Sequence, residues 1–171
     1  MSKNVKKLKI VLVGSNAVGK TSIANRFTRN LFSNRYINTI GCDFYIKTIE
    51  FRGEEYKLII HDIGGQLEFR EFRKKYMDNA DMVMVIFDLN DRDSFEIGEY
   101  VDDVLKMPEK ATWAIVGNKM DLVDKDKVDL SPINVFIEKY KVPLYFTSAK
   151  DNTNIQQTFL ELVKTCVDSK T

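Results

Sequence analysis

Several kinds of residue and signal are scarce in this sequence, and each shortage excludes a class of protein. Only two of its 171 residues are cysteines, Cys42 and Cys166, and their wide separation fits neither a disulfide framework nor a cysteine metal site, so we expect two free thiols. No apolar run approaches the roughly 18 residues that a membrane-spanning helix needs. With 26 basic and 25 acidic residues the net charge is only +1, which predicts no broad attraction to nucleic acid.

Signals for export and lipid attachment are scarce as well. Residues 1–13, MSKNVKKLKIVLV, have no separate apolar core followed by a cleavage site, which argues against a signal peptide. Ser2 stands where myristoylation requires a glycine, and the last four residues, DSKT, do not form a prenylation motif. We therefore expect a cytoplasmic monomer, peripheral to membranes at most, and the sequence leaves membrane attachment open.

What the sequence does contain is a regular alternation of apolar runs and amphipathic stretches. A chain of this length, with 44% hydrophobic and 30% charged residues, predicts one globular domain over residues 1–171. The apolar runs predict strands at Leu8–Val13, Cys42–Phe51, Tyr56–Asp62, Met82–Asp88, Thr112–Gly117 and Leu144–Thr147. The amphipathic stretches predict helices at Lys20–Arg29, Phe69–Asp78, Ser94–Lys106, Ile133–Tyr140 and Ile155–Asp168.

The pattern within the strands predicts how they are arranged. Ile10–Val13, Met82–Phe87 and Trp113–Val116 are apolar on successive residues, which is typical of central parallel strands covered by helices on both faces. Arg52-Gly53-Glu54 instead joins two strand-like runs with no helix between them, which predicts an antiparallel hairpin. The prediction is an α/β fold with a six-stranded, mostly parallel sheet, one antiparallel edge hairpin and helices on both faces. Ligands of such sheets bind at the carboxyl ends of the strands.

The first of these strand ends carries a phosphate-binding motif. Residues 14–21, GSNAVGKT, match G-x-x-x-x-G-K-[ST], in which the glycines let backbone N–H groups cradle phosphate oxygens. Lys20 would reach the outer phosphates and the Thr21 hydroxyl would hold Mg²⁺. The alternative is a chance glycine turn before a helix, which this strand–loop–helix setting makes rare. We expect the nucleotide to contact Ser15, Asn16, Ala17, Val18, Gly19, Lys20, Thr21 and Ser22.

Two later strand ends carry residues suited to reading a base. Residues 118–121 are NKMD, and the Asp121 carboxylate would accept both the N1–H and N2–H₂ donors of guanine, which adenine lacks. Residues 147–150 are TSAK, where the Ala149 N–H would donate to guanine O6. Taken alone, NKMD would also fit a polar strand end with a helix cap, and SAK alone is weak. Together they predict a guanine site made of Asn118, Lys119, Asp121, Ser148, Ala149 and Lys150.

These motifs, with Thr39 in NTIGCDF and with DIGGQ at residues 62–66, occur in an order that resembles the small GTPases of the Ras superfamily. The resemblance covers essentially the whole chain, and TIGCDFYIKTI makes it closest to the Rab branch. It implies a small G-domain, a GTP/GDP cycle with Mg²⁺ and two nucleotide-sensing switches. By position it also implies that Thr39 binds Mg²⁺ while the γ-phosphate is present, that Phe32 packs on the guanine and that Tyr36 closes over the phosphates. Without the resemblance, Phe32 reads as a core residue and Tyr36 as an exposed loop residue.

The segment HDIGGQLEF, residues 61–69, would then contain the chemistry of hydrolysis. Asp62 would hold Mg²⁺ through a water, Gly65 would bring its N–H to the γ-phosphate, and Gln66 would orient the attacking water. The expected catalytic residues are thus Gln66, Lys20, Thr39 and Gly65, and the expected metal ligands are Thr21, Thr39 and Asp62. The spacing D-x-x-G alone is weak evidence for a nucleotide site, because it is common by chance. It becomes strong evidence here because it follows a strand that lies next to the phosphate loop.

The same segment departs from the family pattern in three ways. Ras and Rab chains usually read DTAGQE here. This chain has Gly64 instead of the alanine, which should make the segment more mobile when GDP is bound. It also has Leu67 instead of the glutamate, an acid that helps exchange factors expel nucleotide. His61 replaces an aromatic residue of the effector-facing triad whose other members match Phe44 and Tyr76. We expect effectors, exchange factors and GTPase-activating proteins to bind this face and the switches, and we expect no task for His61 itself.

The rate of hydrolysis is the property that the sequence predicts least sharply. Asn16 lies where Ras proteins have a glycine that leaves room for an activator's arginine, and Arg35 does not match the arginine that large G proteins supply in cis. Intrinsic hydrolysis should therefore be slow, and a partner would accelerate it by about 10³–10⁵. The leading hypothesis is a switch in membrane traffic or signalling that slowly hydrolyses GTP. The alternatives are a GTP-binding scaffold with negligible hydrolysis and, less well supported, a P-loop kinase or ATPase.

Overall fold

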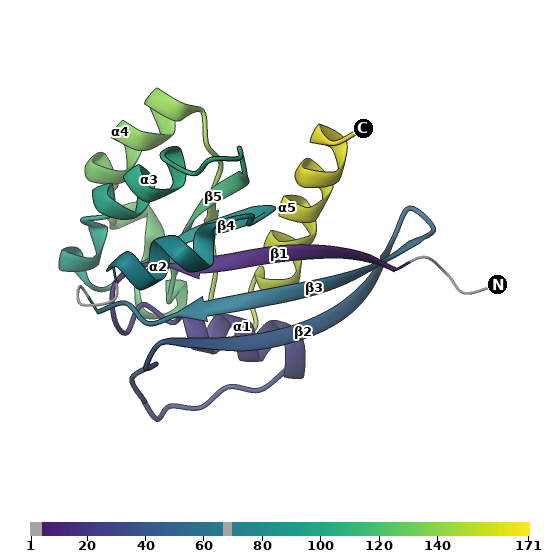
Figure 1. Ribbon diagram of the computed structural model, residues 1–171. Coiled ribbons are helices and arrows are strands. Elements are labelled where there is room, and N and C mark those ends of the chain that lie inside the picture. The colour runs from purple at the N-terminus through teal and green to yellow at the C-terminus, as the bar shows by residue number, and fades with distance from the viewer. Residues whose placement is uncertain (1–4, 67–69) are drawn as a thin grey trace.

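Six strands form one sheet that runs through the middle of the molecule, as the computed structural model shows (Figure 1). The structure describes residues 5–66 and 70–171. The strand order is β2-β3-β1-β4-β5-β6; β2 and β3 pair antiparallel, and the other neighbours pair parallel. The predicted fold class is therefore confirmed. The strands are β1 (Lys6–Val13), β2 (Cys42–Phe51), β3 (Glu54–Ile63), β4 (Met82–Asp88), β5 (Thr112–Asn118) and β6 (Leu144–Phe146).

Helices cover both faces of this sheet, so the molecule has two apolar cores (Figure 1). Within β1, Ile10 and Leu12 enter the core under α1 and α5, whereas Val11 and Val13 enter the core under α2, α3 and α4. Because successive side chains of a strand point to opposite faces, a strand buried on both sides must be apolar at every position. The helices are α1 (Lys20–Arg29), α2 (Arg70–Met77), α3 (Gly98–Leu105), α4 (Ser131–Tyr140) and α5 (Ile155–Ser169).

One predicted helix is wrong in its extent. The stretch 94–106 was expected to be a continuous helix, but the structure has a short 3-10 helix, η2 (Arg92–Phe95), and then α3 from Gly98. The buried Ser94 hydroxyl accepts from the Asp88 N–H at 2.8 Å and donates to the Asp91 carbonyl at 2.7 Å. A serine that bonds nearby backbone in this way competes with helical hydrogen bonds, so the turn at the end of β4 is retained.

Of the remaining elements, α1, β2 and β4 have the predicted bounds, and the others differ from them by one or two residues. The predicted helix 69–78 begins outside the described residues, and its described part is α2. Two further 3-10 turns, η3 (Met120–Leu122) and η4 (Lys125–Lys127), follow β5. Cys42 and Cys166 are both free, as predicted. Across residues 5–66 and 70–171, no helix combines the length and the apolar character that crossing a membrane requires.

Candidate functional site: a nucleotide cavity at the carboxyl ends of the strands

A cavity of about 720 Å³ opens where the parallel strands end. Its wall combines the phosphate loop, the segment 31–39, the end of β3 and the loops that follow β5 and β6. Three of the predicted nucleotide-binding residues do not line it: Ser15 lies on a neighbouring cavity, and Val18 and Ser148 are fully buried behind the wall. The predicted residues that line the cavity are Asn16, Ala17, Gly19, Lys20, Thr21, Ser22, Phe32, Tyr36, Thr39, Gly65, Asn118, Lys119, Asp121, Ala149 and Lys150.

The phosphate loop owes its shape to two glycines that no other residue could replace without strain. Gly14 has a φ of +148°, and a Cβ there would lie 2.1 Å from the carbonyl oxygen of Ile86. Gly19 has a φ of +101°, and its Cβ would lie 2.2 Å from the side-chain nitrogen of Asn118. Helix α1 begins directly after Gly19, so the free N–H groups of its first turn face the cavity. Such a helix start is a ready site for phosphate oxygens.

Lys20 is folded into this loop and is buried. Its Nζ donates to the carbonyl oxygens of Gly14 at 2.8 Å and Ser15 at 2.7 Å. Burial lowers the pKa of Lys20 from 10.5 to about 8; the carboxylate of Asp62 opposes this shift, and Arg73 adds to it. The Lys20 ammonium group is hydrogen-bonded to carbonyls, with Asp62 acting on it as a counter-charge, and a phosphate in the cavity would supply a charged hydrogen-bond acceptor.

Three oxygen-bearing side chains predicted to bind a metal do converge. The Thr21 hydroxyl lies 2.9 Å from the Thr39 hydroxyl and donates to Asp62. The Asp62 carboxylate is fully buried, and among the described residues its Oδ1 has no hydrogen-bond partner. Burial raises the pKa of Asp62, while the Thr21 hydrogen bond and Lys20 oppose the rise. A hard cation with oxygen ligands and bound water fits this group, because Mg²⁺ in nucleotide sites is usually held by one or two carboxylates.

The end of β3 packs closely against both neighbouring loops. A Cβ on Gly65 would lie 2.5 Å from the carbonyl carbon of Ser15 and 2.6 Å from the amide nitrogen of Asn16. The Gly64 N–H donates to the Gly41 carbonyl at 2.8 Å, and a Cβ on Gly64 would lie 2.5 Å from the Thr39 carbonyl oxygen. Gly64 therefore admits a close backbone approach here. The expected mobility with GDP bound stays a prediction.

Gln66 does not line the main cavity. It lies with Ser15, Asn16 and Gly65 on a second cavity of about 730 Å³ beside the phosphate loop. The far wall of that cavity is acidic, because Asp93, Glu96 and Glu99 contribute to it. The prediction for Leu67 lies outside the described residues.

The loop after β5 is held to the phosphate loop by its own side chains. Asn118 is buried; its side-chain N–H₂ donates to the Val18 carbonyl at 3.0 Å, and its side-chain oxygen accepts from the Thr147 hydroxyl at 3.0 Å. The Lys119 ammonium donates to the Ala17 carbonyl at 2.7 Å and pairs with Asp88 at 2.7 Å. These contacts hold the loop after β5 against the phosphate loop.

The carboxylate expected to read guanine is also oriented. Ser148 donates its hydroxyl hydrogen to Asp121 Oδ1 at 2.7 Å, so the second oxygen of Asp121 is left for a ligand. Ser148 thus braces Asp121 from behind the wall of the cavity, instead of lining it.

Several residues of the site were missed by the sequence analysis. Asp88 ends β4 at the ligand-binding edge of the sheet, and that position was the signal that could have identified it. Thr147 precedes the SAK triplet, and Arg26 in the interior of α1 carried no signal in the sequence. Arg35, which does not match the cis arginine of large G proteins, is exposed.

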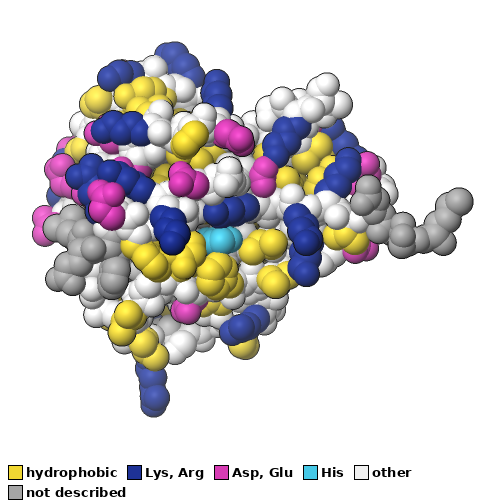
Figure 2. Space-filling model, viewed as in Figure 1, with side chains coloured by type: hydrophobic (Ala, Val, Ile, Leu, Met, Phe, Trp, Pro, Cys, Tyr) yellow, Lys and Arg dark blue, Asp and Glu magenta, His cyan; other side chains and the backbone are white. Residues whose placement is uncertain are grey.

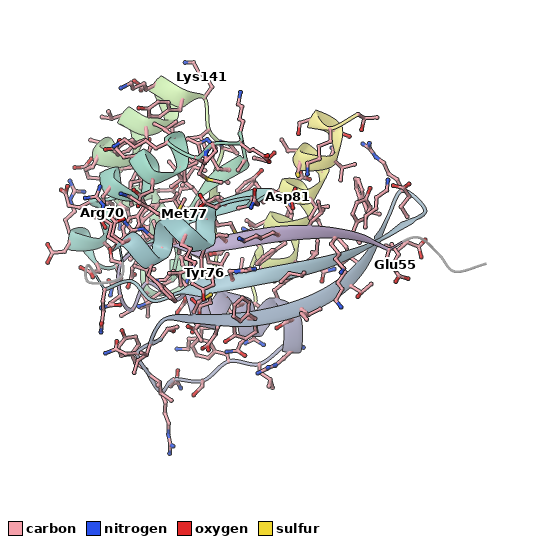
Figure 3. The ribbon with its side chains drawn as sticks, viewed as in Figure 1. Glu55, Arg70, Tyr76, Met77, Asp81 and Lys141 are labelled. Atoms are coloured by element: carbon pink, nitrogen blue, oxygen red, sulfur yellow. The ribbon has the colours of Figure 1, made fainter. Side chains whose placement is uncertain are left out.

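The aromatic triad predicted to face partners is assembled on β2, β3 and α2. The ring centroid of Phe44 lies 4.7 Å from that of His61 and 6.2 Å from that of Tyr76, and Phe44 is 53% exposed. Figure 2 shows the His61 side chain with apolar side chains beside and below it and a basic side chain directly above it, and Figure 3 labels Tyr76 where α2 meets the sheet. Burial lowers the pKa of His61 to about 4, with a smaller contribution from Lys9, so the ring is neutral at neutral pH.

Comparison with known proteins agrees with this geometry over most of the chain. Residues 9–168 match the sequence model of the Ras family. The chain is 36% identical over 156 residues to the GTP-binding protein ypt1 of Schizosaccharomyces pombe, covering 90% of this chain and 77% of that protein. It is 36% identical over 170 residues to the GTP-binding protein YPT1 of Saccharomyces cerevisiae, covering 94% of this chain and 79% of that protein. It is 38% identical over 157 residues to the Ras-related protein Rab-1C of Dictyostelium discoideum, covering 91% of this chain and 78% of that protein. The chain therefore belongs to the Ras family, as a Rab-like small GTPase of the Ras superfamily.

Proposed function

We propose that this protein is a molecular switch that binds GTP or GDP with Mg²⁺ and slowly hydrolyses GTP to GDP and phosphate. The observation that carries the proposal is the single cavity that joins a phosphate loop to a base-reading carboxylate, Asp121, braced by Ser148. Relatives named GTP-binding proteins support the choice of guanine. The switch would act in membrane traffic or signalling, as one domain over residues 1–171.

Each part of the cavity would have its own task in this switch. Thr21, Thr39 and Asp62 would hold Mg²⁺, whose charge would offset that of the β- and γ-phosphates when it is bound. Lys20 would transfer its hydrogen bonds from loop carbonyls to the phosphates. The Gly65 N–H would contact the γ-phosphate, and Gln66, on the adjoining cavity, would hold the attacking water in line.

The partners of the switch would bind its two sensing segments and the exposed aromatic face. A nucleotide that holds Thr39 and Gly65 in place would change the surface beside Phe44, His61 and Tyr76, because Gly64 joins these segments through its contact with Gly41. Effectors, exchange factors and GTPase-activating proteins would read that difference. We expect the protein to act as a cytoplasmic monomer or at the periphery of a membrane, and not on nucleic acid.

The deciding experiment is single-turnover phosphate release from purified protein loaded with GTP and Mg²⁺. We expect a slow release, over minutes to hours, that exceeds a buffer control and stops when Mg²⁺ is chelated. No release above the control would favour the GTP-binding scaffold, in which output depends on binding alone. Tighter binding of ATP than of GTP would instead revive the P-loop kinase or ATPase.

A further inference from the structure

We propose that Arg26 is a specificity-determining residue that positions the backbone at residues 149–150 to contact O6 of guanine. The inference rests on the guanine-nucleotide site proposed above and names a residue that deepens it. Arg26 lies in helix α1, six positions after Lys20, and belongs to none of the sequence motifs. Its side chain reaches across to the loop after β6, more than 120 positions later in the chain.

All three nitrogens of the Arg26 guanidinium group donate hydrogen bonds. Its Nε donates to the Ala149 carbonyl at 2.8 Å, and one terminal nitrogen donates to the Lys150 carbonyl at 2.9 Å. The other terminal nitrogen lies 3.2 Å from both the main-chain and the side-chain oxygen of Asn30. All four acceptors are uncharged, so the planar geometry of the group, rather than charge pairing, determines what it holds. One side chain therefore fixes two successive peptide groups of the base loop and ties them to the end of α1.

The first carbonyl that Arg26 holds belongs to Ala149, whose own N–H lies in the preceding peptide group. Ala149 is only 2% exposed and lines the nucleotide cavity. Within the described residues its N–H donates to no protein acceptor, so it is free to donate to a ligand. Ser148, its neighbour, is held separately: it donates to Asp121 and accepts from the Asp151 N–H at 2.9 Å.

Two side chains would therefore position different contacts to the base. Ser148 orients Asp121, which would read the N1–H and N2–H₂ edge of guanine. Arg26 orients residues 149–150, whose first N–H would read O6. Loss of Arg26 should therefore weaken the O6 contact and leave the discrimination made by Asp121 intact.

Competition binding against a fluorescent GDP analogue tests this division with three competitors. GDP has all the contacts, 6-thio-GDP replaces O6 by a poorer acceptor, and IDP keeps O6 but lacks the 2-amino group. For Arg26→Met we expect the affinity for GDP to fall about three- to tenfold, the effect of one hydrogen bond between uncharged groups. The affinity for 6-thio-GDP should fall less, and the GDP-to-IDP ratio should stay at its wild-type value.

Two further variants separate geometry from charge and from helix stability. Arg29→Met removes the other arginine of the same helix, which contacts Asn25 and the Tyr45 ring, and should leave all three affinities unchanged. Arg26→Lys keeps the charge but not the planar guanidinium group, so its GDP-to-6-thio-GDP ratio should fall as in Arg26→Met, and it replaces that variant in the comparison if Arg26→Met does not fold.

The outcomes distinguish this inference from the function on which it rests. An equal loss of affinity for all three nucleotides would reduce Arg26 to a structural residue and overturn the inference, as would an unchanged GDP-to-6-thio-GDP ratio. Either result leaves the guanine site standing. Wild-type protein that binds ADP as tightly as GDP would instead overturn the proposed function.

Discussion

Arg73 on α2 and Asp103 on α3 form an ion pair that water does not reach, and its removal gives the largest stability change we predict. The Arg73 side chain is 1% exposed and that of Asp103 is 0% exposed. Arg73 donates from Nε at 2.9 Å and from a terminal nitrogen at 2.6 Å to one oxygen of Asp103, and its guanidinium lies 4.5 Å from the centre of the Tyr100 ring. Arg73→Met keeps most of the volume and removes the charge, so Asp103 would keep only its 4.0 Å contact with the exposed Arg70, and Glu99 would lose its partner at 3.3 Å.

Breaking a buried pair from one side costs about 3–5 kcal/mol of unfolding free energy, because the remaining charge is neither solvated nor paired. For a chain of this size, each kcal/mol lowers the melting temperature by roughly 2–4 °C, so a fall of about 6–20 °C is expected. Urea and thermal unfolding, followed by circular dichroism, measure both quantities. All variants need the same excess of GDP and Mg²⁺, since a bound ligand shifts the apparent stability.

Two controls make the reasoning refutable. Arg70, labelled in Figure 3, lies 4.0 Å from Asp103 but is 44% exposed, so Arg70→Met should cost less than about 1 kcal/mol. The double variant Arg73→Met/Asp103→Leu should regain most of the loss, because the fully buried carboxylate is removed with its partner and only the partly exposed Glu99 stays unpaired. A loss below about 1 kcal/mol in Arg73→Met, or a double variant no more stable than the single one, would refute the reasoning.

Three further predictions concern the site. Gly64→Ala would place a methyl group against the Thr39 carbonyl, and this overpacking should cost about 1–3 kcal/mol of stability. The less flexible unfolded chain would return up to about 1 kcal/mol, so we expect a lower free energy of unfolding and, by titration, weaker Mg²⁺ binding. Unchanged values of both would show that the two segments separate freely. Gln66→Leu should lower single-turnover phosphate release at least tenfold with GTP affinity unchanged; an unaltered rate would remove Gln66 from the mechanism. Asp121→Asn should shift nucleotide preference from guanine toward xanthine in competition binding, and continued preference for GDP over XDP would contradict the assignment of Asp121 as the base reader.

The parts of the fold that could be predicted are those in which a local sequence pattern is compatible with only one structure. Strands buried on both faces must be apolar at every position, so β1, β4 and β5 were evident from their runs alone. The turn Arg52-Gly53-Glu54 likewise left no room for a crossover helix, which determined the antiparallel edge. The phosphate loop could be predicted because its glycines, lysine and threonine follow one motif spacing within residues 14–21, although the contacts that require Gly14 and Gly19 come from distant positions.

The parts that could not be predicted depend on contacts between distant positions. Ser94 reads as a helix start in the sequence, and only its burial against the end of β4 turns it into a helix breaker. Arg26 and Arg73 look like surface residues of amphipathic helices, yet one holds the base loop and the other lies inside the protein. Nothing near either arginine in the sequence indicates the loop after β6 or Asp103, because these partners come from other elements of the fold.

The buried Lys20 has a consequence for the life of the empty protein in a cell. Each pKa unit is worth about 1.4 kcal/mol, so a pKa lowered from 10.5 to about 8 means that holding this lysine charged at neutral pH costs on the order of 3 kcal/mol. A nucleotide removes that cost, and the chain that has lost its nucleotide should therefore be the form that chaperones and proteases encounter first.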